Sequence, residues 1–348
     1  MSVVDELIEL AQTPAPTFAE EPRLAWLEAR LDGAPGQRSR DDAGNLIWSW
    51  GDGPPRVVVA AHVDTVFPDG TDLTVRREGD DLVGPGIGDN AAAVVTAVSV
   101  VERLLTDDPA PGAVAFTVGE EGLGDLRGAR AAVAALRPAA FIALEGHMLD
   151  DVVADAVGSL RARVTVRGPG GHSWGDRGTM SAIDGLFELG RRLVGMWVPT
   201  APVNVGTISG GRSVNTIADH AEMLVERRSL QEVQLDIFAG VLDSLELPAP
   251  LTVDVEVVGR RSAGRLDRHA PLLGAVLGVR ERLGLPANLA EGSTDANAAI
   301  AAGVPALCIG VARGSGMHTP QERIDATTLE LGAAQLDGVL RELLEVTP

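Results

Sequence analysis

Acidic residues and histidines stand directly after several apolar segments of this 348-residue chain. His62 follows the run VVVAA, and Asp64 comes two residues later. Glu120 and Glu121 follow AVAFTVG, and Glu145 ends the run FIALE. Imidazole nitrogens and carboxylate oxygens are ligands for Zn²⁺ and related divalent ions, and carboxylates also serve as general bases. These residue types therefore suit a metal site, provided that the fold brings them together.

Two further candidates lie in glycine-rich loops. Asp89 stands in GPGIGDN, directly before a helical pattern, and His318 lies in GVARGSGMHTP after the apolar segment PALCIG. Taken singly, Asp89 is most simply a helix N-cap, and the histidines and glutamates are solvated strand ends. Taken together, so many carboxylates would resist joint ionisation unless a cation compensates them. The set therefore favours a site for a divalent metal ion.

The elements that must position these residues alternate between strand and helix patterns, as in an α/β fold with a mainly parallel sheet. Strands are predicted over 45–50, 56–62, 113–118, 139–144, 288–291 and 305–310. Helices are predicted over 2–12, 20–31, 90–105, 128–136, 270–283, 293–302 and 327–345. Because parallel strands place their carboxyl ends at one edge of a sheet, the candidate ligands should converge there.

The order of elements changes in the middle of the chain. From residue 160 a strand, a helix, two strands, a helix and a strand follow one another. This βαββαβ order predicts a second compact domain inserted into the first. We therefore predict a discontinuous domain over 1–156 and 263–348 and an inserted domain over 157–262.

The composition excludes several classes of function. The formal net charge of −20 argues against nucleic acid or an anionic membrane as a partner. No lysine is present, which excludes P-loop and Schiff-base lysine chemistry. Cys308 is the sole cysteine, so no intrachain disulfide can form, and no segment has the length of a membrane span. With no signal-peptide pattern at the N-terminus, we expect a cytoplasmic protein.

Five ordered motifs resemble those of the M20 family of co-catalytic zinc metallopeptidases and amidohydrolases. They are HVDT, GIGDN, GEEGLG, FIALEG and GMHTPQERID, and the resemblance covers nearly the whole chain, including the inserted domain. GPGGHSW and EGSTDAN are similar to the tripeptidase-like and carboxypeptidase-like branch. The resemblance implies a zinc-exopeptidase-type catalytic domain with an inserted lid that also forms a homodimer.

The resemblance also implies a ligand set for two divalent metal ions per chain, Zn²⁺ first and Co²⁺ or Mn²⁺ as alternatives. His62, Asp89 and Glu145 would hold one ion. Asp89, Glu121 and His318 would hold the other, so that Asp89 bridges the two.

The same resemblance assigns catalytic roles to two further carboxylates. Asp64 would fix the tautomer of His62, and Glu120 would be the general base that acts on a metal-bound water. The resulting hydroxide would attack the amide carbon, and Glu120 would pass the proton to the leaving amine.

Three residues of the inserted domain match family positions that contact the substrate. His172 in GPGGHSW would stabilise the oxyanion, and Asn215 and Arg228 would bind the substrate's carboxylate or backbone. Without the resemblance, these are a loop histidine, a turn amide and a surface arginine.

The implied reaction is hydrolysis of an amide bond in a small peptide or an N-acyl amino acid. A narrow-specificity biosynthetic deacylase of the same fold is an alternative. A non-catalytic binding protein is a third possibility, which the presence of all five ligands and the base disfavours.

Overall fold

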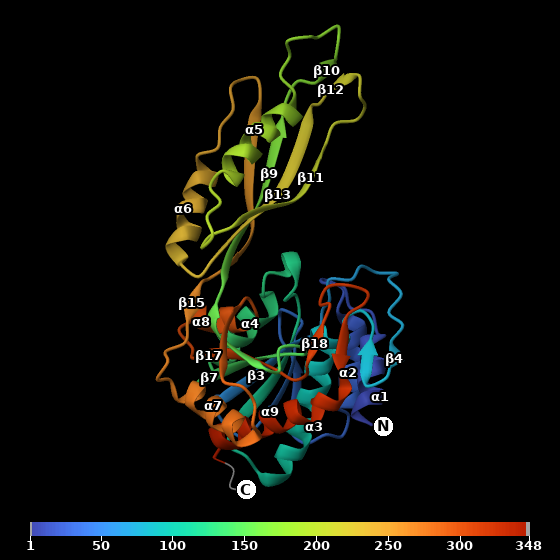
Figure 1. Cartoon of the computed structure of the whole chain (residues 1–348), viewed down its shortest axis with the longest axis vertical. Coiled ribbons are helices and arrows are strands. Elements are labelled where there is room, and N and C mark those ends of the chain that lie inside the picture. The colour runs from blue at the N-terminus through green and yellow to red at the C-terminus, as the bar shows by residue number, and fades with distance from the viewer. Residues whose placement is uncertain (1, 346–348) are drawn as a thin grey trace. The chain divides into compact units, whose positions relative to one another are not determined.

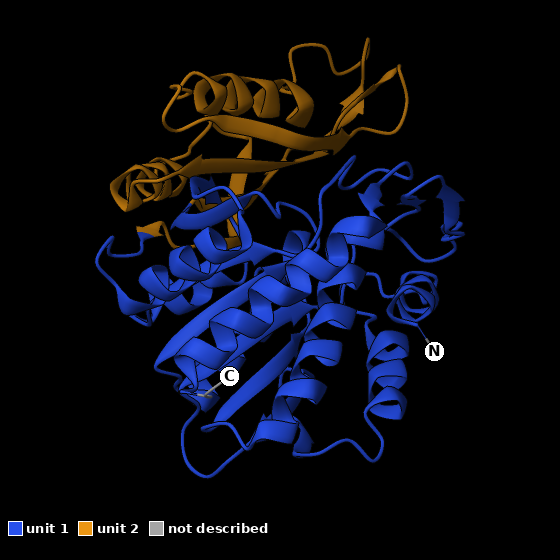
Figure 2. Cartoon of the chain, turned by 60° about the horizontal axis from the view of Figure 1, so that its bottom comes forward, with its two compact units in different colours: residues 1–156, 265–348 blue, residues 157–264 orange. Residues whose placement is uncertain are grey.

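The structure is a computed structural model that describes residues 2–345. Residue 1 and residues 346–348, which the predicted domain boundaries include, lie outside the described residues. The chain forms two compact units (Figure 2). Unit 1 comprises residues 1–156 and 265–348, and unit 2 comprises residues 157–264.

Unit 1 is built on a mixed sheet whose four central strands are parallel. In spatial order they are β6 (Gly112–Thr117), β3 (Val57–His62), β7 (Ala140–Glu145) and β17 (Ala306–Gly310). Beside β6 lie the antiparallel strands β2 (Leu46–Trp50) and β1 (Gln37–Arg40). Beside β17 lies the antiparallel β8 (Asp151–Ala156), which is followed by β15 (Gly264–Arg265) and pairs in parallel with β16 (Asn288–Gly292). The predicted α/β class with a mainly parallel sheet is confirmed.

Helices cover both faces of this sheet (Figure 1). On one face lie α1 (Val3–Ala11), α2 (Glu21–Arg30), α3 (Ala93–Leu104), α7 (Pro271–Leu283) and α9 (Leu329–Leu343). On the other face lie α4 (Arg127–Leu136) and α8 (Ala296–Ala301). Alternate residues of β3 enter the two cores: Val57 and Val59 the first, Val58 and Ala60 the second. The unbroken apolar run before His62 therefore reflects burial on both sides.

Short elements that the sequence did not predict surround the candidate ligands. A small sheet has the order β18 (Gly314–Ser315), β19 (Arg323–Asp325), β5 (Asp81–Val83) and β4 (Arg76–Glu78). It ties the segment around His318 to the segment that precedes Asp89. Three 3₁₀ turns cover Leu105–Asp107, Gly122–Gly124 and Ala326–Thr328.

The helix predicted over 90–105 begins later than expected. A π-helical turn over Ile87–Ala92 precedes α3, and Asp89 (φ −95°, ψ 89°) and Asn90 (φ −129°, ψ 25°) lie outside helical conformation. Asp89 is thus held in an irregular turn and is not the simple N-cap of a regular helix.

Unit 2 has an antiparallel sheet of its own. Its order is β11 (Val203–Gly210), β13 (His220–Ser229), β9 (Gly158–Arg167) and β14 (Thr252–Arg261). The helices α5 (Ala182–Val194) and α6 (Glu232–Asp243) pack against this sheet over a separate hydrophobic core. The short strands β10 (Gly171–His172) and β12 (Thr216–Ile217) form a separate pair.

Across residues 2–345, no helix is both long enough and apolar enough to cross a membrane.

Candidate metal centre

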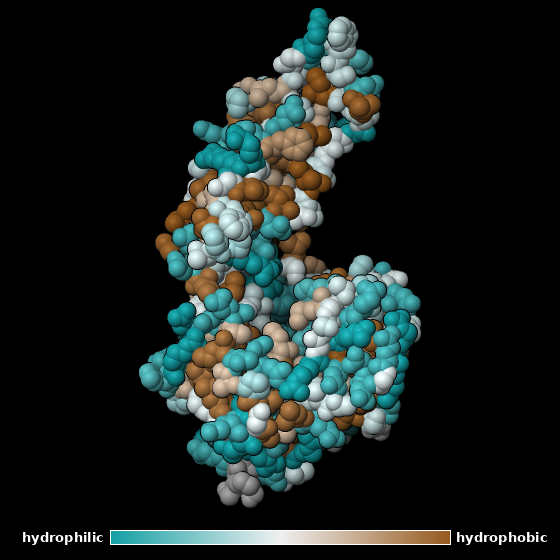
Figure 3. All heavy atoms as spheres, in the orientation of Figure 1, coloured by the Kyte–Doolittle hydropathy of each residue, from teal (hydrophilic) through white to brown (hydrophobic). Residues whose placement is uncertain are grey.

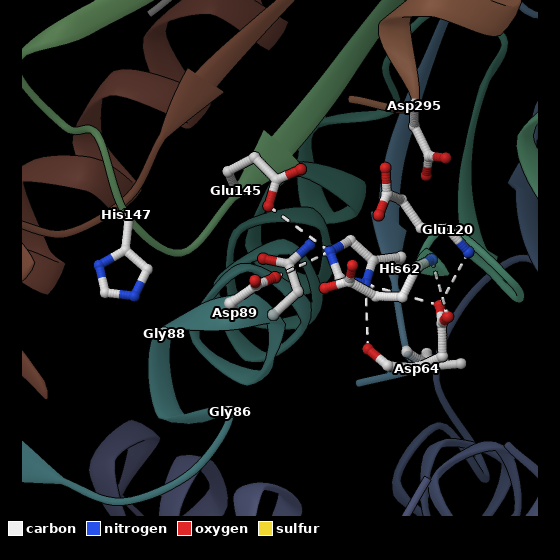
Figure 4. Close-up of polar contacts among 12 residues, drawn as sticks. His62, Asp64, Gly86, Gly88, Asp89, Glu120, Glu145, His147 and Asp295 are labelled. Carbon is white, nitrogen blue, oxygen red and sulfur yellow. Dashed lines mark hydrogen bonds and ion pairs between the residues drawn. The ribbon is translucent and has the colours of Figure 1, made fainter. Parts of the chain in front are cut away.

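The first part of the site forms where β3 and β7 end, beside the turn that carries Asp89 (Figure 4). His62 is the last residue of β3 and Glu145 the last residue of β7, and both side chains are buried. Nε2 of His62 lies 3.0 Å from Oδ1 of Asp89 and 3.6 Å from Oε2 of Glu145. The structure therefore brings together the three residues expected to hold one metal ion.

The second part of the site shares Asp89. Oδ2 of Asp89 lies 3.0 Å from Nε2 of His318, and Oε1 of Glu121 lies 3.1 Å from the same nitrogen. His62, Asp89 and Glu121 each place a ligand atom within 4.8 Å of one another. Because one oxygen of Asp89 faces each histidine, this carboxylate has the position of a bridging ligand.

The electrostatics of the site fit divalent cations. Burial raises the pKa of Glu121 to about 7 and that of Glu145 to about 8, and the charge of Asp89 adds to both shifts. Contacts with Asp89 and Glu121 raise the pKa of His318 to about 10. The cluster thus holds more buried negative charge than its histidines neutralise, and two imidazoles with several carboxylates are a donor set for Zn²⁺. The residues present fit the predicted metal ions.

Asp64 lies behind this cluster, and both its backbone oxygen and its carboxylate face the ring of His62. Nδ1 of His62 lies 3.1 Å from the backbone carbonyl oxygen of Asp64 and 3.6 Å from its carboxylate. The carboxylate accepts the backbone N–H groups of Glu120 and Glu121, both at 3.0 Å, and the hydroxyl of Thr17 at 2.9 Å. Asp64 is therefore placed to orient His62 through both its backbone oxygen and its carboxylate, and the same carboxylate fixes the loop that carries the two glutamates.

Glu120 is buried beside an aspartate that the sequence analysis did not single out. Figure 4 shows the carboxyl group of Asp295 directed toward that of Glu120. Asp295 accepts the hydroxyl of Thr117 at 2.6 Å. Burial, and next the charge of Glu120, raise the pKa of Asp295 to about 7. EGSTDAN contains Asp295, but its distance of 175 residues from Glu120 in the chain gave no sign of this contact.

A second missed residue supports the Asp89 turn. Glu322 is fully buried and accepts the N–H groups of Gly86, Gly88 and Asp89 at 2.9, 2.9 and 2.7 Å. Its Oε1 also lies 2.8 Å from Nε2 of His147. The motif GMHTPQERID includes Glu322, yet backbone donors more than 230 residues away leave no pattern in a sequence.

The three predicted substrate residues lie in unit 2, and the structure brings two of them together. His172 is in β10, and the N–H of Ser173 donates to the backbone oxygen of Asn215 at 3.1 Å. Arg228 lies near the far end of β13, where its Nε donates to Glu226 at 2.7 Å. Within unit 2, His172 and Asn215 are therefore neighbours, and Arg228 is separate from both.

Comparison with known proteins matches this chain to hydrolases. It is 28% identical over 326 residues to a [LysW]-lysine hydrolase of Deinococcus radiodurans, covering 87% of this chain and 86% of that protein. It is 27% identical over 314 residues to an acetylornithine deacetylase of Photorhabdus laumondii, covering 81% and 78%. A Staphylococcus aureus tripeptidase has the same fold, with a TM-score of 0.80, 20% identity, and coverage of 99% of this chain and 98% of that one.

A family model decides the assignment, because it matches most of the chain and includes every residue of the metal cluster. The model of peptidase family M20/M25/M40 matches residues 58–342. The resemblance noted in the sequence is thereby confirmed, and the chain belongs to peptidase family M20/M25/M40.

Proposed function

We propose that the protein is a two-metal hydrolase that cleaves an amide bond of a small peptide or an N-acyl amino acid. One observation carries this proposal: the buried carboxylate of Asp89 lies 3.0 Å from both His62 and His318. A single carboxylate between two histidines, each with a further glutamate nearby, has the geometry of a shared ligand for two ions. His62, Asp89 and Glu145 would hold one ion, and Asp89, Glu121 and His318 the other.

Divalent ions at these positions would polarise the substrate carbonyl and lower the pKa of the attacking water. The chain's own part in the reaction is proton transfer. Glu120 is buried at the same sheet edge and takes the proton from the water, then delivers it to the leaving amine. The hydrogen bond from the N–H of Glu120 to the carboxylate of Asp64 holds the backbone of Glu120, and so fixes the point from which its side chain acts.

His172 supports the oxyanion in this proposal, and its hydrogen bonds favour that role. The N–H groups of Trp174 and Gly175 donate to its Nδ1 at 3.2 and 3.1 Å. A neutral imidazole whose Nδ1 accepts carries its proton on Nε2, which is then a donor. An Nε2–H donor is what a developing oxyanion requires. Asn215 and Arg228 bind the carboxylate or backbone of the substrate.

We further propose that unit 2 forms a homodimer along β11. This strand is at the edge of its sheet, so one row of its backbone groups has no partner strand among residues 2–345. Hydrophobic residues also reach the surface of unit 2 (Figure 3), and Phe187, Trp197 and Ile208 are each more than half exposed. An edge strand with exposed apolar side chains suits pairing with a second copy.

A second candidate function is that of a narrow-specificity biosynthetic N-acyl-amino-acid deacylase. The two curated relatives favour it, because one is named as a hydrolase of a lysine conjugate and the other as a deacetylase of acetylornithine. Both candidates use the same metal centre and differ only in which amides are accepted.

A substrate panel separates the candidates. The purified protein is assayed with dipeptides, tripeptides and N-acetyl amino acids, including N-acetylornithine, before and after chelation and after addition of Zn²⁺, Co²⁺ or Mn²⁺. Hydrolysis that disappears on chelation and returns with metal supports the proposal, and full activity in a demetallated sample contradicts it. Cleavage of many peptides favours a peptidase, and cleavage of one acyl amino acid favours the deacylase.

A further inference from the structure

The turn that carries Asp89 has backbone donors that the turn itself does not satisfy. The π-helical segment Ile87–Ala92 starts after Gly86, which has a left-handed φ of 68° and gives no side-chain cap. The first N–H groups of a helical segment have no partner within it, and in a buried segment each must find an acceptor elsewhere. Here the N–H of Ile87 donates to the backbone oxygen of Gly84, and one carboxylate accepts the N–H groups on either side of it.

Glu322 supplies that acceptor from a distant part of the chain. Its Oε2 accepts the N–H of Gly86, and its Oε1 accepts those of Gly88 and Asp89. Three N–H groups directed at one anion form a nest, which compensates the cost of burying the charge. Because the shortest of these bonds, at 2.7 Å, comes from Asp89 itself, Glu322 fixes the backbone from which the bridging carboxylate projects.

His147 links the same carboxylate to a further ligand segment. It lies two residues after Glu145, is buried, and places Nε2 at 2.8 Å from Oε1 of Glu322. Gly88 and Gly314 leave the room for its ring, since a Cβ at either position would overlap a ring nitrogen of His147. Glu322 itself follows His318 by four residues, and its backbone accepts the N–H of Gly84 at 2.9 Å.

These contacts connect three segments that each carry a proposed metal ligand. We propose that Glu322 is a positioning residue for the metal centre: it holds the Asp89 turn, with His147 as a second anchor, so that one carboxylate bridges both ions. The carboxylate of Glu322 contacts the backbone N–H of Asp89, so any effect of Glu322 on the metal ions passes through Asp89. The inference rests on the proposed two-metal site and adds to it a residue outside the ligand set.

The substitution Glu322→Gln tests this role, because glutamine cannot replace the carboxylate here. Its amide oxygen can accept on one side only, and its NH₂ group then faces an N–H of the turn as a second donor. Loss of a residue that orients a ligand reduces metal affinity or activity by roughly 10- to 100-fold. We expect Zn²⁺ affinity of the apoprotein to fall by about that factor while two ions still bind, and kcat to fall with KM little changed.

Metal affinity is measured by competition with a chromophoric chelator, and folding by circular dichroism and thermal unfolding. Asp325→Asn is the matched control, because it removes a carboxylate from the same segment. The side chain of Asp325 accepts the N–H of Thr327, whereas that of Glu322 accepts N–H groups of the Asp89 turn. Asp325→Asn should bind Zn²⁺ like the parent protein. His147→Gln leaves the carboxylate in place and should weaken Zn²⁺ binding less than Glu322→Gln does.

Three results would overturn the proposal. Unchanged Zn²⁺ affinity in folded Glu322→Gln would show that the turn holds its shape alone. Complete loss of one ion, with the other bound as before, would make Glu322 a ligand. If Glu322→Gln does not fold, unchanged Zn²⁺ affinity in His147→Gln contradicts the proposal that His147 and Glu322 together hold the Asp89 turn. Because affinity is measured without substrate, these results are separate from any failure to find the hydrolysed amide.

Discussion

Glu120 and Glu121 are consecutive residues whose side chains have different surroundings. Glu121 has extended backbone angles (φ −77°, ψ 148°), and successive side chains of an extended backbone point in opposite directions. Accordingly, Glu121 lies 3.1 Å from His318, while Glu120 faces Asp295 (Figure 4). This geometry supports the proposed division, in which Glu121 would be a metal ligand and Glu120 would transfer the proton.

This division predicts different effects for two matched substitutions. Glu120→Gln keeps the shape of the side chain but cannot accept a proton, so we expect turnover to fall by about 10²- to 10⁴-fold with two metal ions still bound per chain. Glu121→Gln should lower the metal content as well. Turnover and metal content are measured on the same preparations by kinetics and atomic emission. Loss of metal from Glu120→Gln would show that Glu120 is a ligand.

The raised carboxyl pKa values predict how the metal-free protein responds to pH. Glu121 and Asp295 ionise near pH 7 and Glu145 near pH 8 in the folded chain, but near their ordinary values of 3.8–4.5 when unfolded. Between the unfolded pKa values and the folded pKa values, the folded state binds more protons than the unfolded state. The free energy of unfolding therefore falls as pH rises through this range. His318, with its pKa raised to about 10, extends the fall above pH 7.

We therefore expect the chelated protein to lose stability steadily from about pH 5 to pH 9, and Zn²⁺ to restore it most strongly at the alkaline end. Chemical unfolding at about pH 5, 7 and 9, with and without metal, measures this. Asp295→Asn removes one of the contributing groups and should make the fall shallower. A stability that stays level or rises over this range in the chelated protein would contradict the assignment of these pKa values.

The helices and strands that the sequence predicts are those with a clear local pattern of apolar residues. The central strands were found because each is a continuous apolar run, and His62 and Glu145 were placed because such runs end at one sheet edge. Strands of two or three residues, such as β5, β18 and β19, are too short to show a hydrophobic periodicity, so the sequence did not predict them. Yet these short strands hold the His318 segment beside the Asp89 turn.

The supporting residues of the site could not be predicted for a different reason. Asp295 and Glu322 bind a threonine hydroxyl and backbone N–H groups, and neither kind of partner can be identified by residue type. The five proposed ligands form a recognisable set because metal chemistry restricts them to histidine and carboxylates. A side chain that holds a turn through main-chain donors becomes visible only when the turn is folded.

The short β10–β12 pair gives a prediction for one of its own residues. Because two backbone N–H groups fix Nδ1 of His172, we expect His172→Ala to remove an oxyanion donor and to lower kcat by about 10²- to 10³-fold, with metal content unchanged. His220→Ala, at the start of β13 in the same unit, is the control and should retain kcat. Equal kcat values for the two variants would refute the role of His172. Steady-state kinetics with the best substrate of the panel provide the measurement.

At the scale of the whole molecule, each unit has its own hydrophobic core. Unit 2 has a four-stranded sheet with the edge strands β11 and β14, and β11 exposes the apolar side chain of Ile208. An open, partly apolar edge is a surface that natural proteins protect or pair. β11 carries no charged side chain between Val203 and Gly210, although its register shifts between Val205 and Thr207. An uncharged edge strand with an exposed apolar side chain favours pairing between two copies of the chain.

Light scattering on the purified protein should therefore give twice the chain mass of 36.1 kDa. Ile208→Lys places a charge on the edge strand, and we expect it to shift the protein toward the mass of one chain, because a lysine in a paired edge must lose its hydration. Val233→Lys is the matched control: Val233 is equally exposed but lies on α6, away from the edge, so this variant should keep the parent's mass. If Val233→Lys separates the copies and Ile208→Lys does not, the interface lies on the helical face and the assignment to β11 is wrong.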